Sequence, residues 1–129
     1  MRTIVRFRTS EGDYAVPVEQ VSEVRSAVGL TPLPAPQPGV VGLMRRGEEA
    51  LPVLAILGAA GRHVVVIDKG PLSFGLLVEE VTGVHQVDEA QIGAPPPGQD
   101  RAVVSGVFHD ELGLVLLLDV DALAGRLST

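Results

Sequence analysis

The sequence contains no cysteine and no tryptophan, and aromatic residues make up only 3% of its 129 residues. Without cysteine, the chain can form neither a disulfide nor a thiolate metal site, which is compatible with a reducing cytoplasm. Its apolar runs, such as Leu114–Leu118, are far too short to cross a bilayer as a helix. The N-terminus lacks the pattern of a secretory signal. We therefore expect a soluble, cytoplasmic protein that does not insert into a membrane.

Nucleic-acid binding is disfavoured by both charge and composition. Residues 1–61 hold six arginines and six acidic residues, whereas residues 62–129 hold four basic and ten acidic residues. The second half of the chain would therefore repel a polyanion. One tyrosine and three phenylalanines also provide too few platforms on which bases could stack.

The usual signatures of catalysis are missing as well. His63, His85 and His109 occur singly, without the spacing that places two imidazoles on one metal ion. Neighbouring carboxylates such as Glu79 and Glu80 point to opposite faces of a strand and rarely form an acid–base pair. No phosphate-binding loop, serine elbow or dinucleotide fingerprint is present. We predict no enzymatic activity, no metal and no cofactor, and an enzyme with an unrecognised site is the weakest alternative.

The most informative feature of the sequence is an internal repeat. The segment YAVPVEQVSEV at 14–24 recurs as FGLLVEEVTGV at 74–84, and residues 40–57 match residues 103–120 with Gly42 aligned to Gly106. The repeat predicts two similar lobes, at about 1–61 and 62–129. A lobe of about 60 residues is marginal on its own, so the lobes are expected to share a hydrophobic core.

Alternating apolar residues and frequent turn residues predict an all-β fold. The expected strands cover residues 2–8, 14–18, 23–30, 40–45, 50–56, 62–68, 72–78, 81–87, 102–109 and 112–119. Four prolines in Pro32–Pro38 predict an extended loop, and helical spacing in Val120–Leu127 predicts a short C-terminal helix. Ten strands in two groups of five indicate two small β-barrels packed around a shared core. Whether the barrels exchange segments is left open.

Positions at which the two lobes differ are the candidate functional residues. Glu23 corresponds to Gly83, and Arg45 and Arg46 correspond to His109 and Asp110. One alternative is that Glu23 is simply a strand residue that faces water. The basic hairpin tip of one lobe and the acidic tip of the other could also pair head to tail between molecules.

These segments resemble, in order and spacing, the CheW-like domain, the adaptor fold of bacterial chemotaxis. The resemblance covers almost the whole chain and rests on the segments YAVPVEQVSEV (14–24), TPLPAPQPGVVGLM (31–44), ALPVL (50–54), HVVVIDKGPLSFGLLVEEVTGVHQV (63–87) and LGLVLLLDVDAL (112–123). It implies a single domain over 1–129 with two five-stranded SH3-like barrels. It also implies a non-catalytic adaptor that binds the regulatory domain of a CheA-type histidine kinase and the cytoplasmic tip of chemoreceptors.

The resemblance also assigns residues. Glu23 matches the acidic residue of the first-lobe kinase contact, and Val21 and Gly42 match positions near the kinase or receptor surface. Arg45 and Arg46 complete the predicted partner-binding set.

The chain departs from the family pattern around the hairpin. The family's Asn-Leu-Arg-Gly sequence aligns with Arg45–Glu48, which puts the expected arginine on Gly47, or on Arg46 if the loop slips by one residue. Ala55 and Leu57 replace a usual acid and base. The chain could therefore be an adaptor of a paralogous pathway, or a self-associating structural module.

Overall fold

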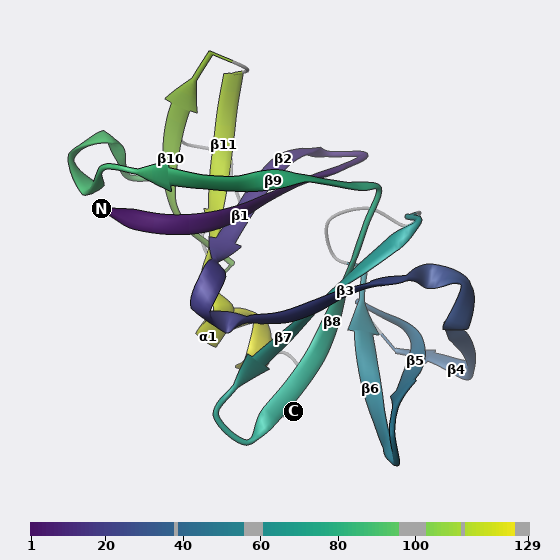
Figure 1. The fold of residues 1–129 in the computed structure, drawn as a ribbon. Helices are drawn as coiled ribbons and strands as arrows, with labels where there is room; N and C mark the ends of the chain where they lie inside the picture. The colour runs from purple at the N-terminus through teal and green to yellow at the C-terminus, as the bar shows by residue number, and fades with distance from the viewer. Residues whose placement is uncertain (38, 56–60, 96–102, 112, 126–129) are drawn as a thin grey trace.

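The computed structural model describes residues 1–37, 39–55, 61–95, 103–111 and 113–125, without the side chains of residues 34–37. This part of the chain forms eleven strands, three short 3-10 helices and one α-helix (Figure 1). The strands are β1 (Arg2–Thr9), β2 (Gly12–Pro17), β3 (Val21–Ser26), β4 (Thr31–Gln37), β5 (Val40–Arg46), β6 (Glu49–Leu54), β7 (His63–Lys69), β8 (Leu72–Val78), β9 (Glu80–Val87), β10 (Val104–Asp110) and β11 (Gly113–Leu118). The helices are η1 (Val18–Gln20), η2 (Ala27–Gly29), η3 (Glu89–Gln91) and α1 (Val120–Gly125).

The strands form two sheets, here called A and B. Sheet A has the order β10-β11-β2-β1-β9, and sheet B has the order β3-β7-β8-β6-β5-β4. The predicted all-β fold, with two SH3-like barrels and a short C-terminal helix, is confirmed. The prediction of five strands in each barrel is correct for sheet A and one strand short for sheet B.

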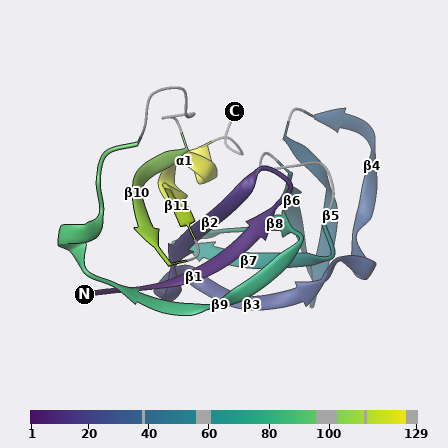
Figure 2. The ribbon, with the colours of Figure 1, turned by 90° about the horizontal axis from the view of Figure 1, so that it is seen from above.

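Each barrel takes one hairpin from the other half of the sequence. The β1–β2 hairpin pairs with β9 and β11 in sheet A, whereas the β7–β8 hairpin pairs with β3 and β6 in sheet B. Figure 2 shows the purple β1 beside the green β9, while the teal β7 and β8 lie with the blue strands. Neither barrel is therefore built from one half of the repeat alone.

The strand pairings repeat as the sequence does. Ala15 of β2 pairs in parallel with Leu117 of β11, and its counterpart Gly75 of β8 pairs in parallel with Val53 of β6. These residues are the ones that the sequence repeat aligns. The duplication therefore extends to strand register, which fixes the face that every side chain occupies.

A bulge is repeated in the same way. The register of β3 against β7 shifts between Val21 and Glu23, and that of β9 against β1 shifts at the corresponding place. The Ser22 hydroxyl donates to the Val66 carbonyl at 3.3 Å, and the Thr82 hydroxyl donates to the Arg6 carbonyl at 3.1 Å. The same irregularity therefore occurs at the start of both strands, and each is accompanied by a hydroxyl bond to the neighbouring strand.

Three apolar clusters fill the molecule. The largest contains Phe7, Ile67 and Phe74 and lies between the barrels, with residues from both sheets. A second cluster contains Ile4 and fills barrel A, and a third contains Val64 and fills barrel B. Because successive side chains of a strand point to opposite faces, the hairpin strands bury both of their faces. Their continuous apolar runs thus serve one barrel and the shared core together, as the sequence predicts.

Two expected elements differ from the structure. The proline-rich segment predicted as a loop forms strand β4 at the edge of sheet B. Proline is tolerated at a sheet edge because its missing N–H is not needed for a ladder. The expected strand 23–30 ends at Ser26, whose hydroxyl accepts a hydrogen bond from the Val28 N–H and begins η2.

The C-terminal helix follows the prediction in position. The Asp119 carboxylate accepts a hydrogen bond at 3.1 Å from the Ala122 N–H, as an N-cap does. Helix α1 then covers Val120–Gly125, and the predicted end at Leu127 lies outside the described residues. Val120 and Leu123 are buried in the shared core.

Candidate protein-binding surface

The predicted partner-binding residues lie on two strands of barrel B. Val21 and Glu23 are on β3, and Gly42, Arg45 and Arg46 are on β5. These strands are separated by β7, β8 and β6 in the sheet order, but the barrel curls and brings them together. The Arg25 guanidinium donates to the Arg45 carbonyl, and Arg46 Nη1 lies 3.4 Å from the Ser22 hydroxyl oxygen. We call this area, from Val21 to Val28 and from Arg45 to Glu49, the β3–β5 surface.

Glu23 is exposed on this surface. Its carboxylate lies 3.6 Å from Arg25 Nε, and the side chains retain 43% and 36% of their accessible area. Ion pairs this exposed are weak, because water competes for both charges. Breaking the Glu23–Arg25 ion pair therefore requires little free energy, and the Glu23 carboxylate can bind a cationic group of a partner instead.

Arg46 is held by groups of its own barrel. Its guanidinium donates to Asp68 at 3.2 Å and 3.3 Å, to Glu49 at 3.0 Å and to the Ser73 hydroxyl at 3.0 Å. Hydrogen bonds, first from Ser73 and then from Arg46, lower the pKa of the Asp68 carboxyl below its ordinary value. The bond to Asp68 in turn raises the pKa of Arg46. This network fastens the β5–β6 hairpin to β7 and β8.

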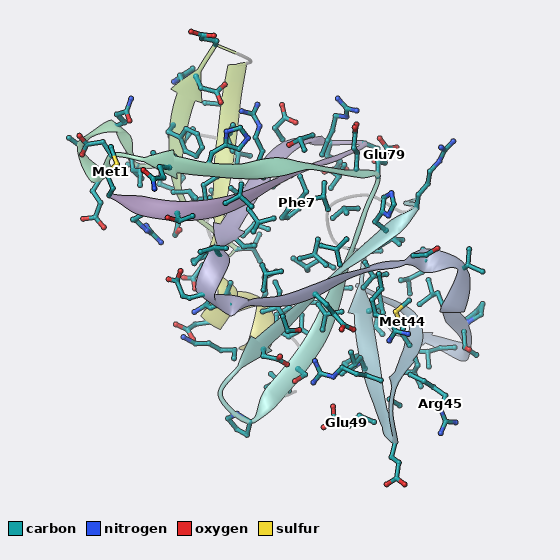
Figure 3. The ribbon with its side chains drawn as sticks, viewed as in Figure 1. Met1, Phe7, Met44, Arg45, Glu49 and Glu79 are labelled. Carbon is teal, nitrogen blue, oxygen red and sulfur yellow. The ribbon has the colours of Figure 1, made fainter. Side chains whose placement is uncertain are left out.

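Arg45 behaves differently from its neighbour. Its side chain points away from the barrel (Figure 3), because successive residues of a strand face opposite sides. Gly47 begins the turn that follows, with a φ of +61°, which is a left-handed conformation that favours glycine. Gly47 is thus a turn residue. Of the two arginines that precede it, Arg45 points outward and Arg46 points toward Asp68.

Gly42 is buried, and its role is in packing. A Cβ at this position would lie 2.4 Å from the carbonyl oxygen of Thr31. Strand β4 can therefore approach β5 only because residue 42 lacks a side chain. Its counterpart Gly106 similarly leaves room for Ile92 and Gly93. Val21 is half-buried and packs against the shared core, so it supports the surface from beneath.

Exposed valines were missed by the sequence reasoning. Val24 on β3 is 45% exposed and Val28 on η2 is 93% exposed, while Val84 on β9, the counterpart of Val24, is 62% exposed. In the sequence, the available signal for Val24 and Val84 is that they occupy equivalent positions of the two repeats.

Within the described ranges, no group of three or more His, Asp or Glu side chains is arranged to hold a metal ion. Among the described residues, no helix has both the length and the apolar character needed to cross a membrane.

Comparison with known proteins identifies the family. The CheW-like domain family matches residues 3–128. The chain is 24% identical to the chemotaxis protein CheW of Rhizobium meliloti over 133 aligned positions, covering 94% of this chain and 86% of the relative. It is 33% identical to protein FrzA of Myxococcus xanthus, covering 74% of this chain and 66% of the relative. The crystal structure of the scaffolding protein TtCheW from Thermoanaerobacter tengcongensis has the same fold, with a TM-score of 0.83, 24% identity, and coverage of 92% and 84% of the two chains. The chain therefore belongs to the CheW-like domain family, whose members are scaffolds and adaptors in chemotaxis-type signalling.

Proposed function

We propose that this chain is a non-catalytic adaptor that couples chemoreceptors to a CheA-type histidine kinase in the cytoplasm. The family assignment supports the adaptor role, and the β3–β5 surface is the observation that supports a protein contact. That surface combines an exposed carboxylate (Glu23), an outward cation (Arg45) and exposed valines at 24 and 28. Partner surfaces of this kind place apolar contacts among charges that set orientation.

Within this proposal, the predicted residues have separate roles. Glu23 and Arg45 contact the regulatory domain of the kinase, since both side chains are exposed. Arg46 and Gly42 shape the hairpin, through the Asp68 network and the close approach of β4. Val21 supports β3 from the core side. The chemoreceptor tip is proposed as a second partner on the basis of family membership, without particular residues.

The test is binding to the regulatory domain of the cognate CheA-type kinase. Glu23→Arg should weaken binding about tenfold by reversing a charge at the contact, while the thermal unfolding midpoint stays unchanged. Glu11→Arg makes the same charge change at the exposed β1–β2 turn and should bind as the unmodified protein does. Equal affinities of the two variants would remove Glu23 from the contact, and no binding of the unmodified protein at micromolar concentrations would overturn the kinase proposal.

Self-association remains the alternative proposal. Head-to-tail pairing of the basic and acidic hairpin tips would need Arg46 and Asp110, and both are engaged inside their own barrels. Arg45 is the remaining cation of the basic tip. Sedimentation over a concentration series separates the two proposals, because an adaptor acting through a kinase can stay monomeric, whereas a self-associating module cannot.

A further inference from the structure

The two sheets have four edge strands, β3, β4, β9 and β10. An uncovered edge offers a row of unpaired N–H and C=O groups to any extended chain, so proteins usually cover or blunt it. Three of the four edges, β10, β4 and β3, are covered or blunted. Strand β10 is bridged by Gly93, which exchanges hydrogen bonds of 2.7 Å and 3.0 Å with Val107. Strand β4 carries three prolines, at 32, 34 and 36, and each lacks an N–H.

Strand β3 is closed by side chains. Arg25 reaches from β3 to the Arg45 carbonyl, and Arg46 reaches back to Ser22. The counterparts of Glu23 and Arg25 on β9 are Gly83 and His85. Within the described residues, no side-chain hydrogen bond or ion pair joins the stretch 83–87 of β9 to another element. Within the described residues, the duplication therefore gives two equivalent edges, and side chains close the one on barrel B but not the one on barrel A.

The free part of β9 is exposed on both faces over Val84–Gln86, whereas Val87 packs into barrel A. Val84, His85 and Gln86 are three consecutive exposed residues, and Val84 retains 62% of its accessible area. A strand covered on one face would alternate between buried and exposed residues. Among the described strands, β9 pairs only with β1, and it runs along the outer margin of the molecule (Figure 2).

Charge indicates which kind of segment fits this edge. Glu79 and Glu80 precede the free stretch, and Asp88 and Glu89 follow it. All four residues are exposed, and Glu80 is ion-paired with Arg8 of β1. A second β9 paired antiparallel would place these acidic ends against each other, which is unfavourable. A segment with basic residues at both ends and apolar residues in its centre would be attracted in either direction.

We propose that the free edge of β9, over Gly83–Val87, binds an extended, basic-ended segment of another protein as an added strand. Main-chain hydrogen bonds would hold the added strand to β9, and Val84 would provide an apolar contact. The acidic residues at both ends of the stretch would favour a segment with basic ends. This site lies on barrel A and does not depend on the kinase contact of the β3–β5 surface.

The probe is the synthetic peptide Lys-Arg-Thr-Val-Thr-Val-Thr-Arg-Lys with blocked termini, added to the full-length protein. Hydrogen exchange of the amides at 83–87 followed by NMR should slow when the peptide binds, and rising salt should weaken binding. Two peptides methylated at alternate backbone nitrogens should differ in affinity, because a paired strand uses only one of its edges. Equal binding of these two peptides, or unchanged exchange of the β9 amides, would overturn the proposal.

Val84 and Val24 occupy equivalent positions of the repeat, so the same substitution at each gives a test variant and its control. Val84→Lys should weaken peptide binding about tenfold by adding a charge that blunts the edge. Val24→Lys makes the same change at the equivalent position of β3 and should alter binding less than about twofold. Both valines are exposed, so both variants are expected to fold. Equal losses in the two variants would show general charge repulsion and overturn the assignment to β9, as would no binding of the unmodified protein at about millimolar peptide, the weak end of specific affinities.

Discussion

The guanidinium of Arg6 on β1 is hydrogen-bonded to the carboxylate of Asp110 on β10, from the opposite half of the sequence. Arg6 is only 2% exposed and also lies 3.3 Å from Asp13 on β2. In barrel B the counterpart of Asp110 is Arg46, which binds Asp68. The β10–β11 hairpin of barrel A and the β5–β6 hairpin of barrel B are thus each fastened by an ion pair, but the hairpin supplies the acid in barrel A and the base in barrel B.

Asp110→Asn should destabilise the protein by about 2–4 kcal/mol, because it removes charge from the partner of a buried cation. Glu111→Gln changes the charge of the exposed neighbour and should alter the free energy of unfolding by less than about 0.5 kcal/mol. Urea unfolding of both variants measures the difference. Equal stabilities would mean that Asp13 alone compensates Arg6.

The exchange of hairpins predicts how the chain behaves when divided. Fragments 1–61 and 62–129 should each be unfolded alone, because each lacks two or more strands of either barrel. Mixed together, they should associate and recover the native spectrum, since the core between the barrels draws on both halves. Circular dichroism and NMR spectra of the separate and mixed fragments test this. A folded fragment 1–61 would contradict the interlaced architecture.

Gly42→Ala should destabilise barrel B by about 1–3 kcal/mol, because the new methyl group would overlap the Thr31 carbonyl. Gly29→Ala is the matched control, since its Cβ would meet no atom within 4 Å and its φ is ordinary. Thermal unfolding of both variants provides the measurement. If Gly42→Ala instead unfolds at the unmodified temperature but loses partner binding, Gly42 contacts a partner directly.

The sequence predicts this fold well because the duplication is visible in it. Aligned residues such as Ala15 and Gly75 occupy equivalent pairings, so the repeat carried information about strand register and not only strand position. The proline-rich segment was misjudged because proline excludes helix but does not exclude an edge strand. The Arg6–Asp110 pair could not be predicted, because Arg6 lies among arginines that share its strand face and its partner is distant in sequence.

The candidate surface was predicted less completely. Glu23, Arg45 and Arg46 stood out because they break the repeat, and the structure brings their strands together. Their different environments depend on barrel curvature, which directs Arg46 to Asp68 and leaves Arg45 outside. A linear pattern assigns the two arginines to opposite faces but does not reveal which face holds a carboxylate.

The Asp68 network makes a prediction about pH. Because the folded-state pKa of Asp68 is lowered, its ionised form stabilises the native state above the carboxyl's ordinary pKa. That contribution is lost as the pH falls through the folded-state value.

Ser73→Ala removes the hydrogen bond that contributes most to the shift, so the pKa of Asp68 should move back toward its ordinary value. NMR titration of the Asp68 side-chain carboxyl carbon in both proteins measures this change. Ser105→Ala is a suitable control, because its hydroxyl bonds the Leu117 carbonyl in the other barrel. An Asp68 pKa that is unchanged in Ser73→Ala would mean that Arg46, rather than Ser73, keeps the carboxylate ionised.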